Sequence, residues 1–101
     1  MDVYISGKIS GLNIIDVLKK FNEATKRLYE KGYVPFNPME LQPIIDNKTW
    51  KDYMIKDIEV LFCCDAIYML KDWGMSRGAR IEYAIAKELN LKIFFEDELF
   101  P

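Results

Sequence analysis

Residues 66–70 carry the sequence AIYML, an uninterrupted apolar run with the length of one β-strand. Strands covered on both faces are apolar throughout, as in the parallel sheets of α/β proteins, so this run predicts a central buried strand. Before it, apolar residues recur at helical spacing over residues 50–62. After it, Ser76 is placed to cap a second helix over residues 77–88.

The remaining segments continue this alternation of strands and helices. Further strands are predicted at residues 3–5, 33–36 and 91–95, a further helix at residues 14–31, and a loop at residues 38–49. Pro35 cannot donate a ladder hydrogen bond, which places its strand at an edge of the sheet. The order βαβαβαβ predicts an α/β fold, a small doubly wound parallel sheet of the flavodoxin or Rossmann type, with four strands and helices on both faces. In such sheets ligands bind beyond the carboxyl ends of the strands.

The composition is that of a folded globular chain, and it limits the classes of function. With 101 residues, 50 % of them apolar and 30 % charged, the chain is expected to form a single domain over residues 1–101. No uncharged apolar stretch approaches the roughly 20 residues of a membrane span, so no transmembrane helix is expected, and no basic leader typical of a signal peptide is visible. The net charge of −2 argues against a nucleic-acid polymer as a partner.

The sequence contains no histidine, and its two cysteines, Cys63 and Cys64, are adjacent. The absence of histidine excludes His-based general bases, Ser-His and Cys-His nucleophile pairs, and most zinc sites. Neighbouring cysteines make a strained disulfide, so both are expected as reduced thiols in the core of a cytoplasmic protein. Any chemistry must then rest on carboxylates, hydroxyls, cationic side chains or backbone amides, and we expect neither a metal nor a cofactor.

Each of the two helices that flank the central run places one carboxylate on or beside its core-facing stripe. The predicted stripes consist of Trp50, Met54, Ile58 and Leu61 in the first helix and of Ile81, Ile85 and Leu89 in the second. Asp57 falls within the first stripe, and Glu82 lies beside the second. Because burying an unpaired carboxylate is costly, such a group is either held by structural hydrogen bonds or functional. Asp65, which precedes the central strand, is expected as a cap or ion-pair partner.

Two loops at the carboxyl edge of the predicted sheet suit an anion. The first offers amides, hydroxyls and one ammonium group from Ser6, Gly7, Lys8, Ile9, Ser10 and Gly11. The helix start at Ser76 and Gly78 offers free amides and a hydroxyl, and Arg77 adds charge. A plain tight turn and a plain N-cap explain the same residues without a ligand. Trp73 either stacks on a base or anchors its loop, while Trp50 is expected in the core.

Together these segments resemble the nucleoside 2-deoxyribosyltransferase superfamily, and especially its short phage and bacterial members similar to nucleoside 5′-monophosphate N-glycosidases. The resemblance rests on YISGKISG at residues 4–11, on Tyr53 with Asp57 four positions later, on CDA at residues 64–66, and on WGMSRGA at residues 73–79 followed by Glu82. It covers almost the whole chain.

The resemblance implies a role for each matching residue. Glu82 matches the nucleophile that attacks C1′ of the sugar, Tyr4 the tyrosine that orients it, and Asp57 the aspartate that contacts the base and assists its departure. Ser76 stands where transferases acting on free nucleosides have an aspartate for the 5′-hydroxyl, and where monophosphate hydrolases have a phosphate-binding serine. Since an aspartate would repel a phosphate dianion, the serine favours nucleotides over nucleosides.

The implied function is cleavage of the N-glycosidic bond of a (deoxy)nucleoside 5′-monophosphate through a glutamyl-sugar intermediate, as a hydrolase or a base-exchange transferase. No cofactor is implied. The expected partners are a small-molecule nucleotide or nucleoside and, because family sites are completed by a neighbouring subunit, further copies in a homodimer or higher homo-oligomer. The completing segment lies beyond the last strand and is expected to be shortened here, since the sequence stops at Pro101. The alternative is a catalytically silent nucleotide-binding or regulatory module.

Overall fold

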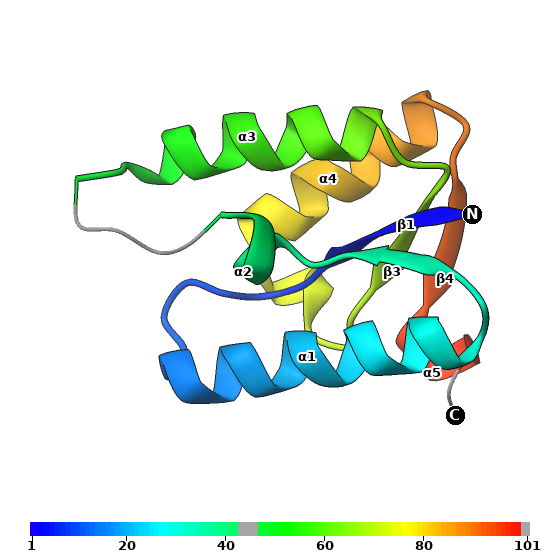
Figure 1. Cartoon of the computed structure of the whole chain (residues 1–101). Coiled ribbons are helices and arrows are strands. Elements are labelled where there is room, and N and C mark those ends of the chain that lie inside the picture. The colour runs from blue at the N-terminus through cyan, green and yellow to red at the C-terminus, as the bar shows by residue number, and fades with distance from the viewer. Residues whose placement is uncertain (43–46, 100–101) are drawn as a thin grey trace.

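The computed structural model describes residues 1–42 and 47–99, which form a parallel β-sheet with helices packed on it (Figure 1). The strands are β1 (Asp2–Ser6), β2 (Val34–Phe36), β3 (Ala66–Met69) and β4 (Lys92–Phe95), in the order β2-β1-β3-β4. Each neighbouring pair is parallel. The predicted α/β fold with four parallel strands is confirmed.

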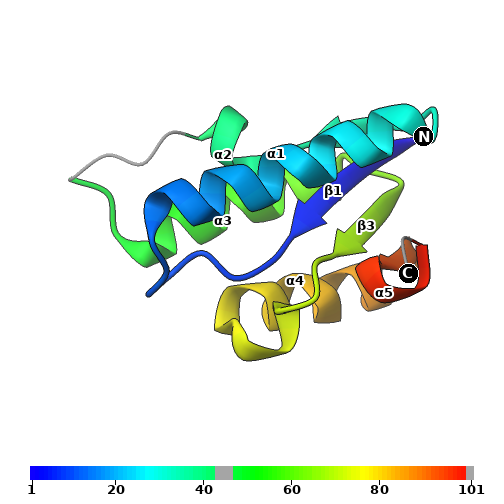
Figure 2. The ribbon, with the colours of Figure 1, turned by 90° about the horizontal axis from the view of Figure 1, so that it is seen from below.

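Helices cover both faces of the sheet, as the sequence predicted (Figures 1 and 2). Helix α1 (Ile14–Glu30) lies on one face, and helices α3 (Trp50–Phe62) and α4 (Arg77–Glu88) lie on the other. The shorter segments are α2 (Pro38–Leu41), the 3-10 turn η1 (Trp73–Met75) and α5 (Glu96–Leu99). Strand β2 lies on one side of β1, and β3 and β4, which come later in the chain, lie on the other side. The carboxyl end of β1 is therefore the switch point at which such sheets bind ligands.

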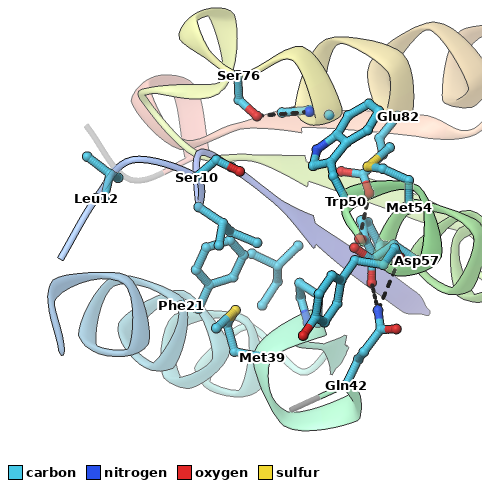
Figure 3. A pocket seen from close by; sticks show the side chains of 18 of the residues that line it. Ser10, Leu12, Phe21, Met39, Gln42, Trp50, Met54, Asp57, Ser76 and Glu82 are labelled. Atoms are coloured by element: carbon cyan, nitrogen blue, oxygen red, sulfur yellow. Dashed lines mark hydrogen bonds between the residues drawn. The ribbon is translucent and has the colours of Figure 1, made fainter. Parts of the chain in front are cut away.

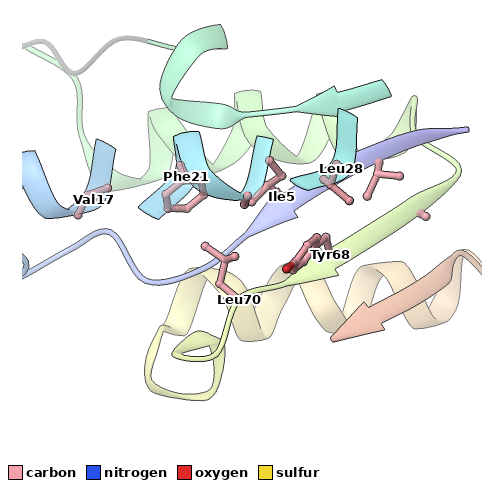
Figure 4. Packing of buried hydrophobic residues seen from close by; sticks show 9 residues of the cluster. Ile5, Val17, Phe21, Leu28, Tyr68 and Leu70 are labelled. Carbon is pink, nitrogen blue, oxygen red and sulfur yellow. The ribbon is translucent and has the colours of Figure 1, made fainter. Parts of the chain in front are cut away.

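The face of the sheet under α1 is closed by apolar residues at helical spacing (Figure 4). Val3 and Ile5 of β1 and Tyr68 of β3 are buried against this helix. The residues that α1 contributes are Val17, Phe21, Ala24 and Leu28. Since these recur every three or four positions, they form one stripe along the helix. This packing fixes α1 against the end of β1, and with it the loop that connects them.

The opposite face of the sheet holds a second core under α3 and α4. Its buried members are Tyr4, Leu61, Cys64, Ile67, Met69, Ala79 and Ala86. Cys63, expected in the core beside Cys64, is exposed, because it caps the end of α3. Tyr4 and Ser6 alternate with Val3 and Ile5 along β1, so both hydroxyl side chains point to this second face. The helices that carry Asp57 and Glu82 are packed on the same face.

Helix α4 turns a different side to the sheet from the one predicted. Ile81, expected in the core-facing stripe, is 36 % exposed, whereas Ala79, Glu82 and Ala86 are buried. The two alanines are small enough for the helix backbone to lie close to the sheet. Glu82, between them, is consequently inside the core and not at its border.

Three local features can be compared with the sequence predictions. The loop predicted at residues 38–49 begins with helix α2, because the Asn37 side chain caps it by accepting the Met39 N–H at 2.9 Å. Residues 43–46 of that loop lie outside the described residues. Strand β2 is at the edge, as Pro35 predicted. Asp65 acts as a cap, since its Oδ2 accepts the N–H of Asp2 at 2.9 Å.

Candidate active site

A cavity of about 560 Å³ opens at the carboxyl end of β1, the switch point of the sheet (Figure 3). Strand β1 and its following loop form its floor, and helices α1, α2, α3 and α4 contribute walls. Among the lining residues are Tyr4, Gly7, Ile9, Ser10, Asp57, Ser76, Gly78 and Glu82, all of them predicted site residues. Phe21, Met39, Trp50, Tyr53 and Met54 give the cavity a largely apolar wall.

Glu82 lies at the centre of the polar groups and is 4 % exposed. The hydroxyl of Tyr4 donates to its Oε2 at 2.7 Å, and the hydroxyl of Ser6 donates to its Oε1 at 2.7 Å. Both carboxylate oxygens are thus held by side chains of a single strand. Ser6, predicted to bind phosphate, faces Glu82 and adds no surface to the cavity.

The surroundings of Glu82 shift its proton affinity. Burial raises its pKa to about 7, the hydrogen bonds from Ser6 and Tyr4 oppose that shift, and the nearby charge of Asp57 adds to it. Burial also raises the pKa of Tyr4 well above its usual value, and the charges of Glu82 and Asp57 act in the same direction. Tyr4 therefore stays protonated and keeps donating to the carboxylate.

Asp57 is held in the cavity wall by Gln42, a residue that the sequence analysis did not single out. Gln42 Nε2 donates to Asp57 Oδ1 at 3.0 Å and to the Tyr53 carbonyl at 3.1 Å. Its own Oε1 accepts from Lys48 Nζ at 2.8 Å. Burial raises the pKa of Asp57 to about 6, while the Gln42 hydrogen bond and the Lys48 charge oppose the rise. Gln42 lies in a predicted loop, and no local pattern marks its contact with a helix 15 positions away.

The first loop contributes less to the cavity than predicted. Gly7, Ile9 and Ser10 line it, whereas Lys8 and Gly11 do not. The Lys8 amide donates to Asp72 Oδ1 at 3.0 Å, and its ammonium points to the Met75 carbonyl at 3.4 Å. An internal carboxylate thus takes the amide that the sequence analysis assigned to an anion. Gly11 serves the turn, since its φ of +80° favours glycine.

The start of α4 lies on the cavity as predicted. Ser76 Oγ accepts the Ala79 N–H at 3.1 Å, which makes it the N-cap, and its own hydroxyl proton can still be donated to a ligand. Gly78 also lines the cavity, and a Cβ at this position would lie 3.0 Å from Met54 Sδ. A larger residue here would therefore require the Met54 side chain to shift by a few tenths of an ångström.

Of the two tryptophans, Trp50 lines the cavity and Trp73 does not. Trp73 lies outside the cavity, with its ring against Tyr83 at 4.7 Å and Phe95 at 6.0 Å between ring centroids. It anchors the loop, and the structure does not bring it to the site. Trp50, expected in the core, lines the cavity instead. The guanidinium carbon of Arg77 lies 3.9 Å from the centroid of the Trp50 ring.

Residues 1–42 and 47–99 contain no group of three Cys, Asp or Glu side chains that could hold a metal ion. Within the same ranges, every helix is too short or too polar to cross a bilayer.

The architecture is similar to that of two solved transferases. A 2-deoxyribosyltransferase from the psychrotolerant bacterium Bacillus psychrosaccharolyticus, described as a biocatalyst for nucleoside synthesis, matches with a TM-score of 0.72 and 17 % identity over 94 % of this chain and 71 % of its own. The 2-deoxyribosyltransferase from Leishmania mexicana matches with a TM-score of 0.67 and 19 % identity over 93 % of this chain and 62 % of its own. The chain therefore spans less than two thirds of the Leishmania protein. At these identities the similarity establishes a common fold.

Comparison of sequences adds a family. No curated protein matches the chain significantly. The family model described as "Domain of unknown function (DUF4406)" matches residues 1–95, nearly the whole chain. The resemblance to the nucleoside 2-deoxyribosyltransferase superfamily is confirmed at the level of the fold. The chain therefore belongs to the DUF4406 family and has the fold of the 2-deoxyribosyltransferases.

Proposed function

We propose that this protein cleaves the N-glycosidic bond of a (deoxy)nucleoside 5′-monophosphate, with Glu82 as the nucleophile. The observation that carries the proposal is the buried Glu82 carboxylate, held on both oxygens by hydroxyl donors in a cavity that also contains Asp57. A second carboxyl group near a nucleophilic carboxylate is the arrangement that retaining glycosyl transfer requires. The two solved transferases with this fold support the same class of reaction.

The first step forms a bond between a Glu82 oxygen and C1′ while the bond from C1′ to the base nitrogen breaks. The electron pair goes to the base, and protonated Asp57 supplies the proton that the departing base needs. Since the pKa of Asp57 is raised to about 6, a fraction of this carboxyl group carries that proton near neutral pH.

In the second step, water or a second base attacks C1′ and the ester bond to Glu82 breaks, which restores the carboxylate. Asp57, now ionised, accepts the proton that the attacking water or base loses. Hydrolysis and base exchange therefore differ only in the group that attacks C1′.

The preference for a phosphate rests on the start of α4. Ser76 offers a hydroxyl at the N-terminus of a helix of 12 residues, where free amides and the helix dipole favour negative charge. Arg77, stacked on Trp50 at the cavity wall, is the nearest residue in sequence that brings a positive charge. Ser10 is a further hydroxyl on the cavity surface. Lys8 is engaged elsewhere and is not required by the proposal.

The test is to incubate the protein with a panel of nucleosides and their 5′-monophosphates, with and without an acceptor base, and to follow free base by chromatography. We expect release of base from monophosphates, faster than from the matching nucleosides. Glu82→Gln should reduce the rate at least 100-fold while nucleotide binding is kept, since it removes only the attacking charge. Ser76→Asp should reverse the preference for monophosphates.

The silent-module alternative gives a different pattern in the same experiment. If the protein is a silent module, nucleotides should raise its melting temperature while no base is released from any member of the panel. Equal binding of nucleosides and monophosphates would instead remove the phosphate part of the proposal. The homo-oligomer stays a prediction, and light scattering at micromolar concentration tests it directly.

A further inference from the structure

Ser6 is placed differently from a residue that binds substrate. It is 1 % exposed, it ends β1, and its hydroxyl donates to Glu82 Oε1 at 2.7 Å. Tyr4, two positions earlier on the same face of the strand, donates to the other oxygen. Tyr4 lines the cavity, but Ser6 does not, so Ser6 reaches Glu82 from within the core.

We propose that Ser6 is a second positioning residue for Glu82, which fixes the plane of the carboxylate together with Tyr4 and keeps it ionised for attack. This inference rests on the proposed function. Two donors that arrive from one rigid strand define the orientation of a carboxylate, whereas a single donor leaves it free to rotate about its hydrogen bond. Because the carboxylate is buried, these two hydroxyls supply hydrogen bonds that water would supply at an exposed position.

The hydrogen bond also has an electrostatic consequence. A hydroxyl that donates to a carboxylate favours its charged form, and the Ser6 hydrogen bond opposes the rise that burial imposes on the pKa of Glu82. The titratable side chains that act on Glu82 are Tyr4 from β1 and Asp57 from α3. Tyr4 stays neutral, and the negative charge of Asp57 makes ionisation of Glu82 harder. The Ser6 hydrogen bond therefore offsets part of the rise in the Glu82 pKa that burial and the charge of Asp57 cause.

The test compares Ser6→Ala and Ser6→Cys with the wild-type protein. Alanine removes the donor, and cysteine fills the same space with a much weaker donor. Both should raise the pKa of Glu82 by about one to two units, the shift expected when a hydrogen bond to a charged group is lost. NMR titration of carbon-13-labelled glutamate measures this shift without any substrate. The reactive form has Glu82 ionised and Asp57 protonated, although the pKa of Glu82 is the higher of the two. The basic limb of the pH profile of kcat/KM therefore follows Glu82 and should move upward by the same amount.

The outcomes separate this inference from the proposed function. If Glu82 titrates at the same pH in wild type and in both Ser6 variants, the positioning role of Ser6 is overturned, whatever the activity. If the titration moves but the wild-type protein releases no base at any pH, the proposed function fails, and the role of Ser6 in attack fails with it. A shift in titration matched by a shift in the pH profile supports both. Melting temperatures of the two variants check that the strand is intact.

Discussion

The ammonium group of Lys20 lies 2.5 Å from Asp72 Oδ2, an ion pair between helix α1 and the turn before α4. Lys20 also donates to the Lys8 carbonyl at 2.7 Å, and the other oxygen of Asp72 accepts the Lys8 amide at 3.0 Å. Both side chains are about three-quarters buried, at 25 % and 22 % exposure. The three residues together tie the loop after β1 to the segment that leads into Ser76, two walls of the cavity.

Breaking this ion pair should weaken substrate binding more than it slows the chemical step. In Asp72→Asn the shape is kept but the charge is lost, so we expect KM to rise about fivefold while kcat changes less than twofold, equivalent to about 1 kcal/mol of binding. Lys20→Met should give the same pattern. Lys56→Met is the matched control, because it breaks an exposed pair with Glu59 on α3. A loss confined to kcat would show that the Lys20–Asp72 ion pair acts on Glu82 and not on substrate binding.

The buried Glu82 carboxylate predicts a stability that falls as the pH rises. Its pKa of about 7 in the folded protein exceeds the ordinary value of 4.5, so the folded state keeps a proton that the unfolded chain has released. The stabilising contribution of this group is complete below about pH 4.5 and is lost as the pH rises to 7, by about 3 kcal/mol in total. Asp57, raised from 3.8 to about 6, acts in the same direction.

Glu82→Gln isolates that contribution. The variant cannot ionise, so its melting temperature relative to wild type should be close to unchanged at pH 4.5 and several degrees higher at pH 8. Glu59→Gln, an exposed carboxylate on α3, should show no such divergence. Parallel pH curves for wild type and Glu82→Gln would mean that Glu82 is ionised throughout, with its hydrogen bonds outweighing burial.

Gln42 predicts a second pH effect, on the acidic side of the activity profile. Gln42→Met keeps the length of the side chain but removes the hydrogen bond to Asp57, so the pKa of Asp57 should rise above about 6. Asp57 then stays protonated at higher pH. Because the pKa of Asp57 lies below that of Glu82, the acidic limb of kcat/KM follows Asp57 and should move upward by up to about one unit. Lys48→Met should move it less, since that charge acts more weakly on Asp57. A limb that stays in place would exclude Asp57 as the proton donor.

The sequence alone predicts the features that depend on residues close to one another along the chain. The apolar run at residues 66–70, the N-cap Ser76 and the edge position of Pro35 each follow from local chemistry, and each is found in the structure. The resemblance of motifs is the sequence signal that pairs Tyr4 with Glu82. Their contact spans 78 positions, and no periodicity reveals it.

The missed features depend on contacts that form only after the chain has folded. Gln42 meets Asp57 and Lys20 meets Asp72 across different elements, with nothing in the local pattern to pair them. The face that α4 turns to the sheet differs from the prediction for a related reason. Hydrophobicity favours Ile81 over Ala79 in the buried stripe, but Ala79 lies against the sheet and Ile81 is exposed.

Gly7 provides a test of how tightly the loop after β1 must approach β3. A Cβ at this position would lie 2.7 Å from Leu70 Cδ1 and 3.0 Å from Leu70 Cβ, well inside contact distance. Leu70 is 1 % exposed and packed in the core under α1, so its side chain has little room to yield. Gly7→Ala should therefore destabilise the protein by about 1–3 kcal/mol, the usual consequence of overpacking a core. Gly74→Ala is the matched control, because a Cβ there meets nothing within 4 Å, and its effect should stay within about 0.5 kcal/mol. Urea unfolding of both variants measures the difference. If Gly7→Ala proves as stable as Gly74→Ala, the loop can move away from β3. The loop that forms the cavity floor is then less rigid than its contacts indicate.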